Sequence, residues 1–207
     1  MVRPVTTVQV GVRRYNHAMD GPPAAWVRGA ASGDQVAWGR LIERYNNLVW
    51  SVARSFRLNV HDATDVTQTT WLRLVEHLDG IKEPDSIGSW LATTTRNECL
   101  ALLRRQGRQG VPLDAVGEVA DVRAAPGEAL LTRERDAELW SALNRMPERC
   151  RRLLRILASD PPPSYQEVGA VLDMAVGSIG PTRARCLEKL RQNMATSARS
   201  NDPRSSQ

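Results

Sequence analysis

The sequence has few of the residues that build metal centres and disulfide frameworks. Its 207 residues include three cysteines, and no two of them form a Cys-x-x-Cys pair. The three histidines are equally scattered. A zinc site therefore has little support, and we expect neither a metal nor a cofactor. Cys150 and Cys186 fall on apolar helix faces, which predicts that they lie in a hydrophobic core.

Several longer patterns are also missing. No apolar run is long enough to cross a membrane, and the N-terminus lacks the apolar segment of a signal peptide, so we expect a cytoplasmic protein without membrane insertion. No nucleophile–base pairing, glycine-rich phosphate loop or metal cluster is visible, so we expect no catalytic residues and no enzyme activity. No segment alternates like a β-strand, which predicts an all-α fold.

Lysine is almost absent, and arginine carries nearly all of the positive charge. The sequence has 28 Lys plus Arg against 23 Asp plus Glu, a net charge of +5, and its only lysines are Lys82 and Lys189. The planar guanidinium of arginine suits phosphate and guanine recognition. An anionic partner is therefore expected, although biased codon usage would produce the same composition.

Helical periodicity divides the chain into two blocks. We expect two small helical domains joined by a flexible acidic linker, the second domain ending in a helix-turn-helix. The linker holds one arginine, Arg123, against four acidic residues: Asp114, Glu118, Asp121 and Glu128. The expected parts are a flexible leader at 1–25, a first domain at 26–108, the linker at 109–132, a second domain at 133–193 and a disordered tail at 194–207.

Within the first block, apolar residues at three-and-four spacing predict helices near 26–31, 36–53, 62–78 and 86–106. Asp62 and Ser86 are the expected N-caps of the last two helices. The side chains expected in the core include Val36, Leu41, Ile42, Tyr45 and Leu48, followed by Val66, Trp71, Leu74, Val75 and Leu78 and then by Trp90.

The stretch from 164 to 191 has the layout of a DNA-reading helix-turn-helix. Ser164 and Glu167 have the spacing of a capping box. After a short break, Ser178 is the expected N-cap of a second helix with Pro181 in its first turn. That helix would bury Ile179, Cys186, Leu187 and Leu190 and would expose Arg183, Arg185, Lys189 and Arg191. Pairs of helices with arginines are common, so this stretch alone leaves DNA binding open.

Three motifs, taken together, resemble a bacterial sigma factor of the extracytoplasmic-function group, the compact kind that keeps only conserved regions 2 and 4. They are DATDVTQTTWLRL at 62–74, SIGSWL at 86–91 with RN at 96–97 and LLRR at 102–105, and the stretch from MPER at 146–149 to VGSI at 176–179. The resemblance covers about 26–192. It implies that the first block is region 2 and the second is region 4. It also implies that the protein binds core RNA polymerase, directs it to promoter DNA and helps to open the duplex.

The resemblance further implies roles for individual residues. Contacts to core polymerase would come from Asp65, Gln68, Thr69, Leu72 and Arg73. Contacts to the downstream promoter element would come from Lys82, Arg96, Asn97, Arg104 and Arg105. Contacts to the upstream element would come from Ser178, Thr182, Arg183, Arg185 and Lys189. Many members of the group are held by an anti-sigma factor, so such a protein is a further candidate partner.

Two departures from the family pattern limit the inference. Thr64 and Thr69 stand where an acidic residue is usual, and Gly180 and Pro181 replace a more polar pair in the recognition helix. The promoter sequence is therefore not implied. A free-standing helix-turn-helix regulator remains the main alternative, and an RNA-binding helical protein fits the charge without fitting the order of the motifs. Binding to core polymerase separates the sigma factor from both.

Overall fold

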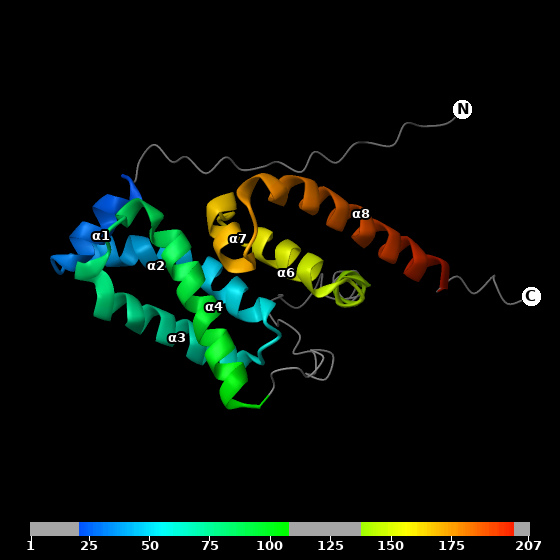
Figure 1. Cartoon of the computed structure of the whole chain (residues 1–207), viewed down its shortest axis with the longest axis horizontal. Coiled ribbons are helices and arrows are strands. Elements are labelled where there is room, and N and C mark those ends of the chain that lie inside the picture. Colours follow the sequence, from blue (N-terminus) through cyan, green and yellow to red (C-terminus); the bar gives the residue numbers. More distant parts are fainter. Residues whose placement is uncertain (1–20, 108–137, 201–207) are drawn as a thin grey trace, which may run out of the picture.

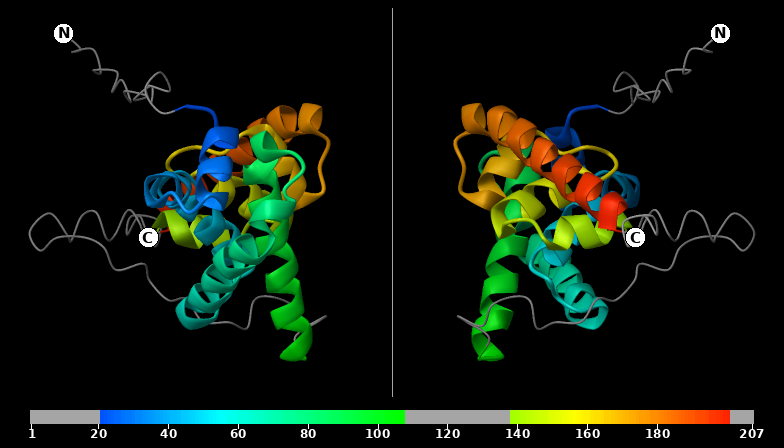
Figure 2. Two further views of the ribbon diagram at one scale, coloured as in Figure 1. Left: turned by 90° about the vertical axis from the view of Figure 1, so that its left-hand side faces the viewer. Right: turned by 90° about the vertical axis from the view of Figure 1, so that its right-hand side faces the viewer.

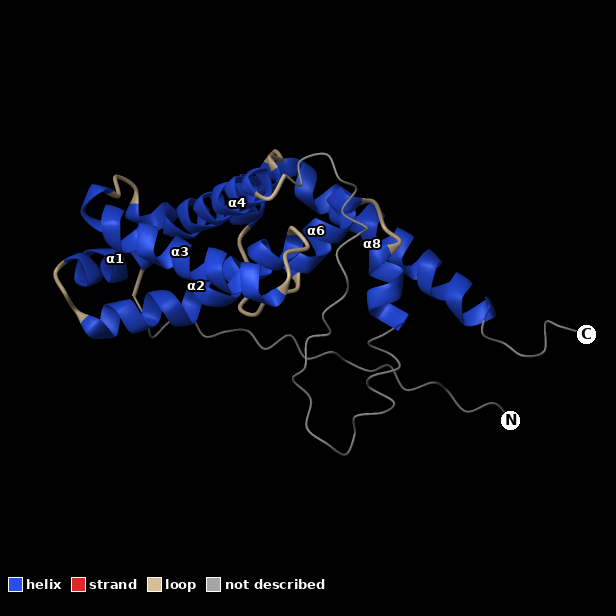
Figure 3. Ribbon diagram, turned by 90° about the horizontal axis from the view of Figure 1, so that it is seen from below, coloured by secondary structure: helices blue, strands red, loops and turns tan. Residues whose placement is uncertain are grey.

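The computed structural model describes residues 21–107 and 138–200, and all regular structure in these two ranges is helical (Figure 3). The expected all-α fold is confirmed for this part of the chain. The predicted linker at 109–132, most of the predicted leader and residues 201–207 lie outside the described ranges.

The first block consists of α-helices joined by short turns. Its elements are α1 (Pro23–Ala31), α2 (Gln35–Ser55), α3 (Val60–His77), the 3-10 helices η2 (Leu78–Gly80) and η3 (Pro84–Ser86), and α4 (Ile87–Arg105). The second block opens with a helix whose described part is 138–144. It continues with α6 (Glu148–Leu157), α7 (Tyr165–Leu172) and α8 (Val176–Ser200) (Figure 1).

The expected disordered tail is wrong over 194–200, because α8 continues through these residues. The chain has neither glycine nor proline between Pro181 and Pro203, and it supplies Met194, Ala195 and Ala198 to the extended helix. Alanine and methionine favour the helical conformation, so nothing local ends α8 at the position expected from its apolar face.

Side-chain caps determine where the helices of the first block begin. At the start of α2, Asp34 Oδ1 accepts a hydrogen bond from the Val36 N–H at 2.8 Å. The expected N-cap of α3 is wrong: Asn59 caps this helix, and its Oδ1 accepts from the Asp62 N–H at 2.8 Å. Asp62 therefore lies in the first turn, where a negative charge is favourable beside the helix N-terminus. Ser86 does occupy the N-cap position of α4, without a side-chain cap bond.

The helix-turn-helix forms at α7 and α8. Both bonds of the predicted capping box are present, with the Glu167 N–H donating to Ser164 Oγ at 3.2 Å and the Ser164 N–H donating to Glu167 Oε2 at 2.6 Å. The predicted N-cap of the second helix is wrong, because α8 begins before Ser178. The Ser178 hydroxyl instead donates back to the Ala175 carbonyl at 2.7 Å, and Pro181 lies within the helix.

Three apolar side chains expected in the core lie at the surface. Val36, Ile42 and Val75 are 65, 45 and 59% exposed. An apolar helical stripe is buried only across the width that neighbouring helices cover, and sequence spacing does not reveal that width. Trp71 and Trp90, which were also expected in the core, do pack against it while remaining half-buried.

The two blocks pack directly against each other. α7 lies against α4, and α6 lies against α2 (Figures 1 and 2). Buried side chains form one continuous cluster from Val27 in α1 to Cys186 in α8. Helices on either side of the predicted linker therefore share one hydrophobic core.

Close approach between α4 and α7 depends on the absence of a side chain at Gly88. A Cβ atom at this position would lie against the Glu167 carboxylate and 2.8 Å from Cε1 of Tyr45 in α2. Glu167 is 6% exposed, so its carboxylate is enclosed between the blocks. Burial, together with the nearby Glu167 carboxylate, raises the pKa of the Tyr45 hydroxyl to about 12.

Polar contacts reinforce the junction of α2 with the second block. The Asn47 side-chain amide donates to the Asp160 carbonyl at 2.5 Å, and Arg155 donates to the Arg54 carbonyl at 2.9 Å. These bonds satisfy backbone carbonyls at the edge of the shared core.

Arg152 of α6 contributes a cation–π contact to the same junction. Its guanidinium lies 4.2 Å from the ring centroid of Phe56, the buried residue that ends α2. Burial lowers the pKa of Arg152, and an ion pair with Glu148 opposes this effect. The arginine nevertheless remains charged, because its ordinary pKa is far above neutral pH.

We predict that Gly88→Ala destabilises the protein by about 1–3 kcal/mol, because the added methyl group forces Glu167 or Tyr45 to move in a packed interface. Urea unfolding of the full chain measures the effect. The matched control is Gly39→Ala, since Gly39 is an exposed position in α2 with nothing within 4 Å of an added Cβ. We expect the control to be neutral or stabilising by up to about 1 kcal/mol. A Gly88→Ala variant as stable as the wild type would mean that α4 and α7 do not approach this closely.

Candidate binding surfaces

One face of α3 presents most of the residues expected to contact polymerase. Asp65, Gln68 and Leu72 are exposed at helical spacing, and Thr69 beside them is half-buried. Leu72 is 62% exposed, and the neighbouring Val75 is 59% exposed. Exposed large apolar side chains grouped among polar ones are typical of protein–protein contact sites.

Arg73, also expected on this surface, already has partners within the chain. It donates to Glu76 Oε2 of the same helix at 2.9 Å and to Glu98 Oε1 of α4 at 3.4 Å. These bonds, above all the hydrogen bond to Glu76, raise the pKa of the guanidinium. All three groups are accessible to water, and exposed ion pairs of this kind contribute little stability. Arg73 can therefore exchange an internal carboxylate for an external one at small cost.

The residues expected to bind the downstream element do not form a single cluster. Arg104 and Arg105 are exposed together in the last turn of α4. Lys82 is exposed in the loop before α4, at the opposite end of this helix from the two arginines. The helix is about 27 Å long. Asn97 is exposed between these two ends. The arrangement is an elongated surface, suited to following a nucleic-acid backbone and unsuited to enclosing a small ligand.

Arg96 differs from the other downstream residues. Arg96 is half-buried. The pKa of Arg152 in α6 is lowered mainly by its own burial, and the positive charge of Arg96 lowers it further. Arg96 therefore lies toward α6, at the junction of the two blocks. Its side chain is therefore partly covered in the packed arrangement.

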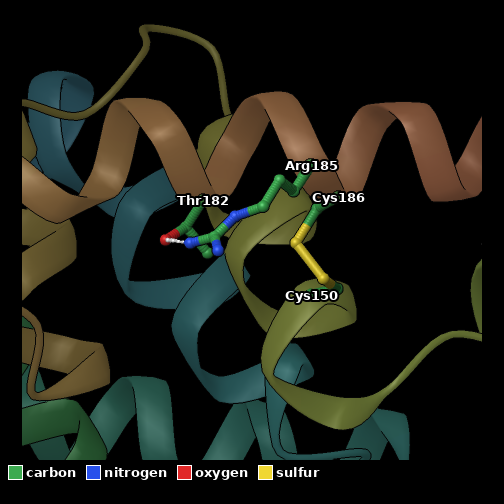
Figure 4. Close-up of a disulfide and its surroundings, with 4 residues drawn as sticks. All are labelled: Cys150, Thr182, Arg185 and Cys186. Atoms are coloured by element: carbon green, nitrogen blue, oxygen red, sulfur yellow. Dashed lines mark hydrogen bonds between the residues drawn. A yellow bond between two sulfur atoms is a disulfide. The ribbon is translucent and has the colours of Figure 1, made fainter.

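The expected upstream-element residues lie along the water-facing side of α8. Ser178, Thr182, Arg185 and Lys189 follow each other at spacings of three and four residues, which places them in one stripe. Arg185 and Lys189 are exposed, whereas Ser178 and Thr182 are half-buried. Arg183, also exposed, lies beside this stripe. Arg185 donates to Thr182 Oγ1 at 3.3 Å, a bond that orients the guanidinium along the helix (Figure 4).

Behind this stripe, the prediction that Cys150 and Cys186 belong to the core is confirmed, because Cys186 is buried and Cys150 packs against the core cluster. Cys150 of α6 and Cys186 of α8 form a disulfide (Figure 4). Both residues lie on the faces that the apolar pattern assigned to the core, and Cys186 is 1% exposed. The spacing of the two cysteines contained no pairing signal, because their proximity depends on how α6 and α8 pack. Cys99 is the remaining cysteine and is buried as a free thiol.

Other kinds of site find no support among the residues that the structure describes. Within 21–107 and 138–200, no group of three or more His, Cys, Asp and Glu side chains is arranged to hold a metal ion. None of the helices in these ranges combines the length and the apolar character that spanning a bilayer requires.

Comparison with known proteins identifies the first block. Residues 41–109 match the family model of sigma-70 region 2. The chain is 30% identical over 172 residues to the ECF RNA polymerase sigma factor SigE of Mycolicibacterium smegmatis, covering 80% of this chain and 65% of that protein. It is 27% identical to the probable RNA polymerase sigma factor RfaY of Xanthomonas campestris, covering 84% of this chain and 45% of that protein. The chain thus spans less than two thirds of the length of these two relatives.

A third relative is matched over most of its length. The RNA polymerase sigma factor CnrH of Cupriavidus metallidurans is 30% identical over 168 residues, which cover 75% of this chain and 87% of CnrH.

Two solved structures share the fold. CnrH in complex with the cytosolic domain of CnrY superposes with a TM-score of 0.57 and 24% identity, covering 84% of this chain and 97% of that one. The sigma factor RpoE of Bartonella quintana, in complex with the anti-sigma factor NepR, gives a TM-score of 0.57 and 22% identity over 76% of this chain and 96% of that one. The region 2 match and the similarity to SigE and CnrH show that the chain belongs to the extracytoplasmic-function group of bacterial RNA polymerase sigma factors.

Proposed function

We propose that this protein is a sigma subunit that binds core RNA polymerase in the cytoplasm, directs it to specific promoters and helps to open the DNA. The main support is the 30% identity to a sigma factor that is matched over 87% of its length. In this proposal the protein acts as an initiation factor and not as an enzyme, and its functional residues bind without catalysing a reaction. Region 2 comprises 26–108, region 4 comprises 133–193, and the acidic segment 109–132 tethers them.

The exposed face of α3 is the proposed polymerase contact. Leu72 supplies the apolar centre, and Val75, which sequence analysis had assigned to the core, extends it. Asp65 and Gln68 provide a carboxylate and an amide for hydrogen bonds around this centre. Removing two large apolar side chains from water provides affinity, while the polar rim determines orientation.

The surface along α4 is the proposed downstream-element contact. Arg104 and Arg105 would bind phosphates, which positions the duplex without reading its sequence. The loop before α4 and the helix segment with Asn97 would hold the separated strands. A base turned out of the stack costs a few kcal/mol, which contacts in a protein pocket must offset.

The stripe on α8 is the proposed upstream-element contact. In a helix-turn-helix, the second helix enters the major groove and the first crosses the backbone. Arg185 can form two hydrogen bonds with a guanine edge, and its bond to Thr182 keeps the side chain extended along the helix. Arg183 and Lys189 are placed to bind the flanking phosphates.

Binding both promoter elements at once would require the blocks to separate. α7 lies between α4 and α8, so the two DNA-reading helices are about two helix-packing distances, or roughly 20 Å, apart. Two elements separated by a single turn of duplex are already about 34 Å apart. Separation would also release Arg96 for phosphate binding. An anti-sigma factor is proposed as a further partner, supported by the complex of the structurally similar RpoE with NepR.

Run-off transcription tests the proposed function. Purified protein is combined with core RNA polymerase on a pool of promoter-bearing fragments, with core polymerase alone as the control. Discrete new transcripts are expected, and their start points locate both promoter elements. Failure to produce transcripts together with failure to co-elute with core polymerase would favour a free-standing helix-turn-helix regulator. Co-elution without transcripts would retain the polymerase contact and point to promoters absent from the pool.

We predict that Leu72→Asp weakens binding to core polymerase by about 2 kcal/mol or more, roughly 30-fold, because it places a charge at the apolar centre of the contact. Fluorescence titration of labelled protein with core polymerase measures the affinity. The matched control is Ile42→Asp, which changes an exposed apolar residue on α2 in the same way. Both variants should unfold at nearly the wild-type temperature. Equal losses of affinity in the two variants would contradict the assignment of the α3 face.

We predict that Arg185→Ala weakens upstream-element binding by about 1–3 kcal/mol and relaxes the preference for one base pair. Arg183→Ala should instead weaken binding to all sequences equally. It should also reduce the slope of log affinity against log salt concentration by about one. Binding of the polymerase complex to promoter variants at several salt concentrations distinguishes the two effects. Arg191→Ala is the control, since this exposed arginine near the far end of the stripe pairs with Glu188. Unchanged affinity in the first two variants would refute the α8 assignment.

A further inference from the structure

The disulfide between Cys150 and Cys186 encloses the first helix and the turn of the helix-turn-helix, together with the start of its second helix. The two residues are 36 positions apart, and the closed loop contains most of α6, all of α7 and the first part of α8. Their Cα atoms are 5.3 Å apart, a separation that a disulfide spans without movement of the backbone. Reduction therefore leaves two adjacent thiols in a structure that can form the bond again.

The bond attaches the DNA-reading helix to α6 at the residue next to Arg185. Successive residues of a helix point about 100° apart, so holding Cys186 against α6 fixes the direction of the exposed Arg185 side chain. Figure 4 shows Arg185 bonded to Thr182 of the same helix. Farther along α8, Asn193 donates to the Ala142 carbonyl at 3.1 Å and accepts from Arg145 at 3.3 Å. These hydrogen bonds hold the C-terminal half of α8 against residues 142–145. The disulfide is the only covalent cross-link within the described residues.

The two cysteines of the bond differ in access from each other and from Cys99. Cys150 is half-buried in the first turn of α6, between Arg149 and Arg151, whereas Cys186 is buried. An oxidant must reach the sulfur, so Cys150 is the one of the pair that an oxidant meets first. Burial raises the pKa of the Cys99 thiol to about 12, which keeps that residue unreactive.

We propose that Cys150 and Cys186 form a reversible thiol–disulfide switch, in which oxidation fixes α8 against α6 and strengthens promoter binding. The proposal rests on the proposed function for its effect on transcription. A sigma factor works where thiols are normally kept reduced, and disulfides in such surroundings are usually transient and redox-sensing. The reduced chain would retain its fold with a less ordered α8, and the oxidised chain would hold the recognition stripe in place.

Hydrogen peroxide is the oxidant that we assign to the switch. The Cys150 thiolate attacks one peroxide oxygen, the O–O bond breaks, and hydroxide leaves, which gives a sulfenic acid at Cys150. The Cys186 thiolate then attacks this sulfur, the S–O bond breaks, and a second hydroxide leaves as the S–S bond forms. With the two thiol protons the products are one disulfide and two water molecules. The sulfurs together lose two electrons, which the peroxide gains. A dithiol reverses the bond by thiol–disulfide exchange.

The first test follows the chemistry and the state of α8. The full chain is treated with peroxide or with dithiothreitol, freed of reagent, denatured and alkylated. Mass spectrometry should find three labels after reduction and one, on Cys99, after oxidation. In the native protein, oxidation should slow amide exchange in the first half of α8 and raise the Tm by about 5–15 °C. Three labels after peroxide, or equal exchange in both forms, would overturn the switch.

The second test measures the functional effect. Protein oxidised or reduced in advance is added, without reductant, to core polymerase for run-off transcription at limiting protein. We expect the oxidised form to give on the order of fivefold more transcript. The variant Cys150→Ser with Cys186→Ser should show the lower yield after either treatment, whereas Cys99→Ala should keep the difference.

The outcomes separate the two proposals. Equal yields from the two forms would overturn the redox control of promoter binding. Failure of both forms to transcribe or to bind core polymerase would contradict the proposed function. The labelling and exchange measurements would still decide in that case whether the two cysteines control α8.

Discussion

The buried carboxylate of Glu167 connects the local structure of the second block with the packing of the whole protein. One of its oxygens accepts from the Ser164 N–H, which closes the capping box and begins α7. The same side chain lies against Gly88 of α4 and near Tyr45 of α2. An enclosed carboxylate is costly unless it is hydrogen-bonded, and the capping box supplies that bond. The start of the helix-turn-helix is thereby coupled to its docking on the first block.

The docked arrangement divides the surface of the protein into a covered part and an available part. The sides of α4 and α6 that face each other contain half-buried arginines, among them Arg96 and Arg152. The exposed faces of α3 and α8 carry Leu72 and Arg185, which point toward water without rearrangement. The proposed polymerase and upstream-element contacts are thus available in the packed form, whereas Arg96 of the proposed downstream contact is half-buried at the junction.

Much of the protein could be predicted from local patterns. Three-and-four periodicity predicted the helices, and the capping-box spacing predicted the start of α7, because both signals depend on residues within a few positions of each other. The same periodicity placed Arg183, Arg185 and Lys189 on the outer side of α8, where the structure has them. One error arose where two capping residues of similar strength lie three positions apart, and Asn59 caps α3 in place of Asp62.

What the sequence determined by itself was the set of helices, their apolar faces and the family motifs. The tertiary structure decided which part of each face is covered, so Val75 is exposed although its spacing is that of a core residue. It also decided that Gly88 meets Glu167 and that Cys150 bonds to Cys186. Each of these pairs joins helices far apart in the chain. Periodicity describes one helix at a time, whereas such contacts depend on how two helices are placed relative to each other.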